Sequence, residues 1–189
     1  MAEASSLVRL QRDYEIELDW RGFELHPGTP RGGMSLSDMF GAERSRQMRR
    51  YLLDFAARAG VEGMVVPEHK PNTRRALALA EHARDRGRLH PARTNLMNAY
   101  WREGLDVESD AVLRHAARAS GLDPEAALSA IESPAILARV DAMGAEAARE
   151  GVTGIPTFFV GDRVVVGAQP YPVLSAAAEA AGAPRRSGQ

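Results

Sequence analysis

The stretch from residue 151 to residue 168 constrains the fold of this 189-residue chain more than any other. It holds two short apolar runs, residues 158–160 and 164–166, separated by Gly161 and Asp162. Glycine tolerates a positive φ and aspartate bonds its own backbone, so this pair predicts a tight turn between two antiparallel strands. Because both runs are apolar throughout, the pattern predicts a hairpin buried on both faces. Pro156 precedes the first strand, where its missing N–H costs no ladder bond.

The central part of the chain, residues 35–150, carries mostly helical signals. Asp123-Pro124-Glu125 combines a capping side chain, a proline at the first helical position and an acid in the first turn. Ser133-Pro134 repeats this device and opens a helix that the pattern extends to Glu150. These signals predict a block of several short helices.

The first part of the chain reads as a helix followed by a strand. Leu7, Leu10 and Tyr14 recur at helical spacing. From residue 15 to residue 25, apolar and polar side chains then alternate, which is typical of a strand. The apolar set of this segment is Ile16, Leu18, Trp20, Phe23 and Leu25.

Strand-forming segments therefore lie at both ends of the chain, with helices between them. This order predicts an α/β fold in which residues 1–34 and 151–189 form a sheet domain and residues 35–150 form a helical insertion. Only three strands are visible, namely residues 15–25 and the two strands of the hairpin.

The composition excludes several classes of function. The chain has no cysteine, which rules out disulfides, thiolate metal sites and a cysteine nucleophile within these residues. Its five histidines show no metal-ligand spacing, so no metal is expected. A formal net charge of -1 gives no reason to expect nucleic-acid binding. No apolar run approaches the roughly 20 residues that span a bilayer, and no signal-peptide pattern is present, so we expect a cytoplasmic protein that does not bind membranes.

Five stretches resemble, in order, the DsbA-like thioredoxin-fold family, especially its FrnE-like branch. This branch is related to 2-hydroxychromene-2-carboxylate isomerases and kappa-class glutathione transferases. The similarity covers nearly the whole chain and is most specific between residues 151 and 171. The matching stretches are residues 20–27, 71–77, 99–104, 151–157 and 167–171.

The resemblance implies a substrate-binding role for the loop Gly154-Ile155-Pro156-Thr157. In the family, the proline at the position of Pro156 is cis, and the backbone of the preceding residue pairs with an extended substrate like an added strand. The resemblance also makes Asn72, Tyr100 and Trp101 candidates for the substrate site. A helix cap explains the position of Asn72 fully and is the favoured interpretation, whereas helix packing and a pocket wall explain the two aromatic residues equally well. His26 is most simply a strand-end residue, and it could act as an acid or base only if it faced the cleft.

The chain departs from the family at its start. Family members begin with a strand and a Cys-x-x-Cys motif at the first helix, and neither is in this sequence. The thioredoxin topology places that strand in the middle of the sheet, where its loss would leave neighbouring backbone groups unpaired. The resemblance therefore implies that roughly 10–15 residues, a strand and a helix start, are missing from the given chain.

Three functions are compatible with these observations. The first is a thiol–disulfide oxidoreductase or isomerase in its complete form. It would act on protein or small thiol and disulfide substrates and would need no cofactor. This chain would supply no catalytic residue and would be inactive alone. The second is a glutathione-dependent isomerase or transferase, in which serine replaces the first cysteine. The third is a non-catalytic peptide-binding module, which could complete its sheet with a partner or as a homodimer.

Overall fold

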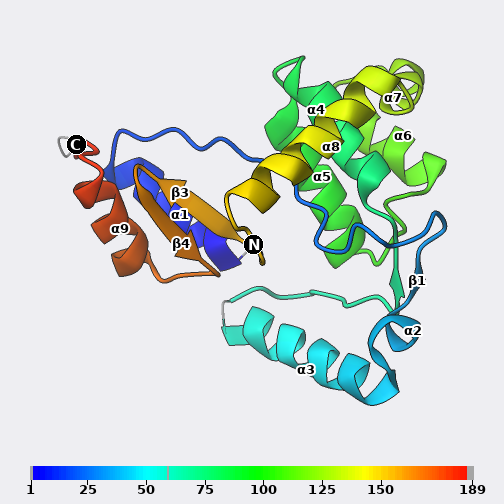
Figure 1. The fold of residues 1–189 in the computed structure, drawn as a ribbon, viewed down its shortest axis with the longest axis horizontal. Helices are drawn as coiled ribbons and strands as arrows, with labels where there is room; N and C mark the ends of the chain where they lie inside the picture. The colour runs from blue at the N-terminus through cyan, green and yellow to red at the C-terminus, as the bar shows by residue number, and fades with distance from the viewer. Residues whose placement is uncertain (1, 59, 187–189) are drawn as a thin grey trace.

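The computed structural model describes residues 2–58 and 60–186 of the chain (Figure 1). The described elements are α1 (Ala2–Asp13), β1 (Met34–Ser35), α2 (Leu36–Phe40), α3 (Ala42–Arg58), β2 (His69–Lys70), α4 (Arg74–Arg84), α5 (Leu89–Trp101), α6 (Asp110–Ala119), α7 (Pro124–Ile131), α8 (Pro134–Arg149), β3 (Thr157–Val160), β4 (Arg163–Val166) and α9 (Tyr171–Ala180). The fold is thus mixed α/β with mostly helical content and small sheets, as the sequence predicts.

One hydrophobic cluster joins the two ends of the chain. In Figure 1, α1 and α9 lie beside the β3–β4 hairpin, and the buried side chains of the two helices pack together. The Tyr14 side chain is fully buried, and its hydroxyl donates a hydrogen bond of 2.6 Å to Glu179 on α9. The Tyr171 hydroxyl donates one of 2.6 Å to Asp13. The members of this cluster are Leu7, Leu10, Tyr14, Leu174 and Ala178, with Ile16, Leu18, Trp20, Phe158, Val165, Tyr171 and Ala183 packed against them.

A second hydrophobic cluster lies within the helical block formed by α4 to α8. Leu113 on α6 and Ile131 on α7 are fully buried in it. The predicted helix starts are present: Asp123 accepts a bond of 2.7 Å from the Ala126 N–H, and Ser133 caps α8. The local signals of the sequence therefore define this block well. The division of the chain into residues 1–34 with 151–189 and residues 35–150 stays a prediction.

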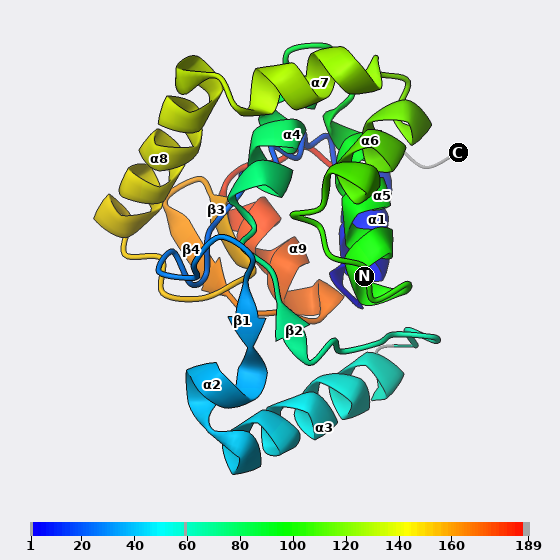
Figure 2. The ribbon, with the colours of Figure 1, turned by 90° about the vertical axis from the view of Figure 1, so that its right-hand side faces the viewer.

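Helices α2 and α3 form an arm that projects from the rest of the molecule (Figure 2). Its root is an antiparallel pair of two-residue strands, with Met34 opposite Lys70 and Ser35 opposite His69. Gly33 precedes this pair with φ of 69°, and a Cβ atom there would lie 2.4 Å from the Lys70 carbonyl oxygen. Only glycine fits this position, because both the backbone angle and the space exclude a side chain.

The strand predicted for residues 15–25 is wrong. Residues 15–24 are without regular structure, and the neighbouring bridge joins Tyr14 to Arg185. The predicted alternation is nevertheless present, because Ile16, Leu18 and Trp20 pack against the cluster of α1 and α9. A strand is defined by ladder bonds to a neighbour, and no described strand pairs with this segment. We call residues 15–25 the connector, since they run from α1 toward the helical block.

Side chains hold the connector on the helical block. Arg84 of α4 donates to the Trp20 carbonyl and lies 2.6 Å from Asp19. The guanidinium of Arg93 on α5 stacks over the Trp20 ring, 3.6 Å from its centroid. Arg84 also pairs at 3.1 Å with Glu81, whose side chain is 6% exposed. The connector therefore packs on one hydrophobic cluster and is ion-paired to the other part of the molecule.

The hairpin has the predicted turn, but the prediction that both of its faces are buried is wrong. β3 and β4 pair antiparallel, with Val160 opposite Arg163 across the turn. Phe158 and Val165 pack against the cluster of α1 and α9. The opposite face is open, because its side chains Phe159, Val164 and Val166 are 50%, 54% and 57% exposed. Neighbouring residues of a strand point to opposite faces. Only the face that holds Phe158 and Val165 packs against the cluster of α1 and α9.

Within residues 2–58 and 60–186, no helix is long and apolar enough to cross a membrane. The cytoplasmic location stays a prediction.

Candidate substrate-binding loop

The loop before β3 is built around a cis peptide bond between Ile155 and Pro156. Two hydrogen bonds hold it. The Thr157 hydroxyl donates to the Gly154 carbonyl at 2.8 Å, and the Gly167 N–H donates to the Pro156 carbonyl at 2.8 Å. Pro156 is thereby attached to the start of the β3–β4 ladder. The role of this loop in substrate binding stays a prediction.

Ile155 is the residue of this loop that is open to a ligand. Its side chain belongs to the exposed large hydrophobic residues, at 56% exposure. Its backbone N–H and C=O form no hydrogen bond with the described residues. A free backbone donor and acceptor on an exposed residue can pair with an incoming extended chain, as an added strand does.

Next to Ile155, the outer edge of β3 also carries backbone N–H and C=O groups that do not pair with β4. In an antiparallel pair, residues alternate between those bonded to the partner strand and those facing away. The Gly167–Pro156 bond places Phe158 and Val160 among the residues that are bonded to β4. Thr157 and Phe159 therefore direct their N–H and C=O groups away from β4. Among the described residues, β3 pairs with β4 and with no other strand.

The side chain of Asn72, one of the candidate site residues, already has hydrogen-bond partners within the fold. Its side-chain oxygen accepts a hydrogen bond of 2.9 Å from the Arg74 N–H at the start of α4. Its amide nitrogen donates one of 2.7 Å to the Thr29 carbonyl. The side chain thus caps α4 and fastens the loop that precedes β1.

The aromatic candidates lie at the C-terminal end of α5. The rings of Tyr100 and Trp101 meet edge to face, with centroids 4.7 Å apart. Tyr100 packs against the core of the helical block, and this burial raises the pKa of its hydroxyl. The role of both residues in substrate binding stays a prediction.

His26 lies at the root of the arm. Its ring centroid is 5.4 Å from that of Phe40. Burial lowers the pKa of His26, and the nearby charge of Lys70 lowers it further, which favours the neutral ring. Across the described part of the chain, no three His, Asp or Glu side chains gather where they could hold a metal ion.

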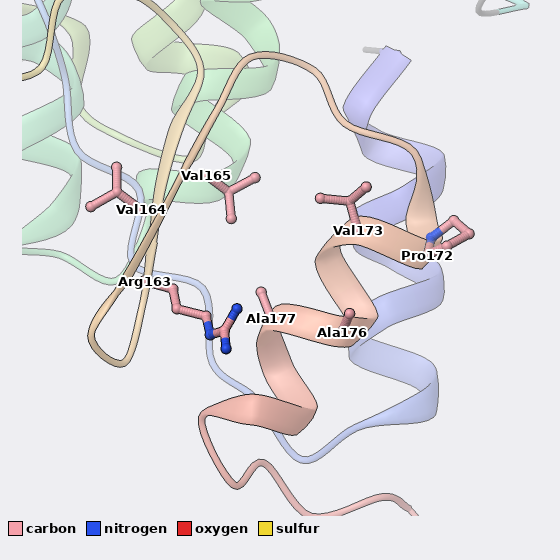
Figure 3. A pocket seen from close by; sticks show the side chains of 7 residues that line it. All are labelled: Arg163, Val164, Val165, Pro172, Val173, Ala176 and Ala177. Atoms are coloured by element: carbon pink, nitrogen blue, oxygen red, sulfur yellow. The ribbon is translucent and has the colours of Figure 1, made fainter.

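Among the grooves on the surface of the described residues are two that no candidate site residue lines. One, of about 490 Å³, lies between β4 and α9 and is lined by Arg163, Val164, Val165, Pro172, Val173, Ala176 and Ala177 (Figure 3). The other, of about 450 Å³, lies at the C-terminal end of α3. The sequence does not indicate the first groove, because a hairpin predicted to be buried on both faces leaves neither Val164 nor Val165 at the surface.

The fold and the cis-proline loop define a class of protein, the thioredoxin-like domains of the DsbA type. A family model described as a DSBA-like thioredoxin domain matches residues 2–179. The chain therefore belongs to this family, which confirms the family and the fold that the sequence indicates. No curated protein sequence matches the chain.

Solved structures give two particular relatives. The chain is similar to a probable DsbA oxidoreductase from Streptomyces coelicolor, with 26% identity, a TM-score of 0.82, and 96% of this chain and 83% of that chain covered. It is also similar to a 2-hydroxychromene-2-carboxylate isomerase, with 20% identity, a TM-score of 0.73, and coverage of 95% and 88%. The second likeness shows the shared fold alone.

Proposed function

We propose that this chain carries the substrate-binding part of a DsbA-like thiol–disulfide oxidoreductase or isomerase. In such an exchange, an attacking thiolate forms a mixed disulfide with one substrate sulfur, and the other sulfur leaves as a thiolate. The chain has no cysteine, so the attacking sulfur must come from outside these 189 residues. Its own part is to hold an extended substrate, and alone it has no thiol–disulfide activity.

The observation that carries this proposal is the free backbone of Ile155 beside the cis proline. The Ile155 N–H and C=O are available, and the outward groups of Thr157 continue the same edge. An extended peptide placed here adds a strand to the hairpin, and its main chain supplies most of the contacts. No charged side chain belongs to the loop from Gly154 to Thr157, which suits a substrate chosen by backbone shape rather than by charge.

The test is binding of a labelled, extended apolar peptide of about eight residues, measured by fluorescence anisotropy. A series of peptides, each with one N-methylated amide, removes one donor at a time and leaves the protein unchanged. Strand addition predicts that affinity falls at every second position, by about five-fold for a lost hydrogen bond of ~1 kcal/mol. Equal losses at all positions, or no binding at millimolar peptide, would refute the proposal.

A protein variant provides a matched pair for the same assay. Ile155→Pro removes the backbone N–H, whereas Ile155→Ala removes only the side chain. We expect the proline variant to bind the unmodified peptide more weakly than the alanine variant. In an insulin-reduction assay, the chain alone is expected to be inactive, and activity from this cysteine-free chain would contradict the assigned role.

A glutathione-dependent isomerase or transferase is the second candidate. It is supported by the fold that the chain shares with the 2-hydroxychromene-2-carboxylate isomerase. Glutathione is itself a short peptide, so the free backbone of Ile155 offers it the same contacts. Binding would raise the melting temperature as reduced glutathione is added at millimolar concentrations. An unchanged melting temperature would reject this candidate.

A further inference from the structure

We propose that the side-chain amine of Lys70 is a covalent modification site that condenses with small aldehydes to form an imine. Lys70 lies on β2, in the two-residue ladder that joins the arm to the rest of the molecule (Figure 2). It is the one lysine of a chain that has 24 lysine and arginine residues. The site lies at the root of the arm, so it does not depend on the function proposed for the loop before β3.

The ladder fixes the position from which the Lys70 side chain starts. Lys70 pairs with Met34, and the preceding residue, His69, pairs with Ser35. Neighbouring residues of a strand point to opposite sides. The side chain of His69 is exposed, whereas that of Lys70 is half-buried. Lys70 therefore leaves the ladder on its more covered side.

The amine of Lys70 forms no hydrogen bond and no ion pair with residues 2–58 and 60–186. Each described side-chain nitrogen or oxygen that is shielded from solvent, on a residue that is not exposed, has a hydrogen-bond partner. The Lys70 nitrogen has none, so it must be open to solvent. Two carboxylates at the root of the arm are already engaged, because Glu68 pairs with Arg49 at 2.6 Å and Glu108 accepts a bond of 2.9 Å from the Gly32 N–H.

A half-buried amine without a carboxylate partner favours its neutral form. An ammonium ion loses hydration when its side chain is covered, and no negative charge offsets that loss here, so burial lowers the pKa of Lys70. The charges of Lys70 and His26 also oppose each other. Arg75 shows the contrast, because its side chain is 16% exposed but lies 2.7 Å from both Asp110 and Glu132.

The neutral amine has the free electron pair that attacks a carbonyl carbon. In the proposed reaction, the Lys70 nitrogen bonds to the aldehyde carbon, and a proton passes from nitrogen to oxygen. The hydroxyl group then leaves with the second N–H proton as water, and a C=N bond forms. The step consumes no oxidant or reductant. The arginines do not compete for a simple aldehyde, because a guanidinium stays protonated. A small aldehyde suits the site because the nitrogen, rather than the whole side chain, is accessible.

The experiment is labelling with propanal and cyanoborohydride, which reduces the imine to a stable secondary amine. The variant Arg118→Lys adds an ordinary, exposed amine on α6, so two lysines of one molecule compete for the same aldehyde. Peptide mass mapping gives the initial rate at each position. Lys70 should be alkylated roughly ten-fold faster than the introduced lysine, although it is less exposed, because more of its amine is neutral.

Denaturation provides the matched control for this comparison. In concentrated guanidinium chloride the two lysines should react at similar rates, because the fold no longer covers Lys70. Equal rates in the folded protein, slower alkylation of Lys70, or a difference that persists in the denatured chain would each overturn the proposal. Lys70→Arg keeps the charge but removes the amine, and it should lose the fast labelling. The peptide assay on Lys70→Arg tests the loop before β3 separately, since that loop is unchanged in this variant.

Discussion

Replacing Arg84 by methionine tests whether the connector is held by side chains rather than by a β-ladder. Methionine keeps much of the length of the side chain but removes all three of its polar contacts, with Glu81, Asp19 and the Trp20 carbonyl. Glu81 keeps its second partner, Arg139, at 2.6 Å, so the variant leaves no orphaned buried carboxylate. The expected loss of stability therefore comes from the contacts that Arg84 makes with the connector.

The magnitude follows from the exposure of each partner. A hydrogen bond from a charged donor contributes about 1.5–3 kcal/mol, and the Arg84 side chain is only 28% exposed. The Asp19 side chain is 53% exposed, so that ion pair adds about 0–1 kcal/mol. We expect Arg84→Met to lower the free energy of unfolding by about 2 kcal/mol. For a chain of this size, that corresponds to a melting temperature lower by about 4–8 °C.

The assay is thermal unfolding followed by circular dichroism, with Arg114→Met as the matched control. Arg114 pairs at 2.9 Å with Glu125, but the side chains are 39% and 70% exposed, so its loss should cost less than about 1 kcal/mol. Asp19→Asn measures the exposed ion pair alone and should also have a small effect. An Arg84→Met variant that melts within about 1 °C of the natural chain, or no lower than Arg114→Met, would refute the reasoning.

Three further predictions concern helix caps, pH and the root of the arm. Asp123→Ala should cost about 1 kcal/mol in chemical denaturation, whereas Ser109→Ala should cost little, because Asp123 caps its helix with a side-chain hydrogen bond and Ser109 does not. Hydrogen bonds from Arg12 and Tyr171 lower the pKa of Asp13 to about 2, so this carboxylate stabilises the fold above its unfolded pKa of about 3.9, and the stabilisation is lost as the pH falls to about 2. Asp13→Asn should therefore flatten the decrease in melting temperature between pH 5 and pH 2, and an unchanged profile would contradict this. Gly33→Ala should be strongly destabilising and should expose the arm to limited proteolysis, because the new Cβ would collide with a backbone carbonyl of β2.

The helical block could be predicted from sequence because its signals are local. Asp123 and Ser133 are each followed by a proline, and each side chain caps the helix that begins there. The hairpin turn at Gly161 and Asp162 could be predicted for the same reason, and Gly161 has a φ of 57°. In each case the residues that decide the structure are within four positions of one another.

The errors concern properties that depend on distant parts of the chain. Residues 15–25 have the alternation of a strand, but whether they form one depends on a neighbouring strand that no local pattern reveals. The apolar sequence of β3 and β4 says that both faces favour burial, but not that a partner exists for each. Phe158 finds one on α1 and α9, and Phe159 does not. For the candidate site, the loop from Ile155 to Thr157 could be predicted from the family resemblance. The hydrogen bond between Asn72 and Thr29 could not, because it joins residues that are far apart in the sequence.

The way in which the connector is held has a consequence for amide hydrogen exchange. Residues 16–24 form no backbone–backbone hydrogen bond with the described residues, although Trp20 is clamped by Arg84 and Arg93. Exchange protection reports hydrogen bonding of the amide rather than anchoring of the side chain. Residues 16–24 should therefore exchange as fast as a free loop while the Trp20 ring stays fixed. Rapid exchange of this segment would then indicate a backbone without interstrand hydrogen bonds, and not a hinge between the two hydrophobic clusters.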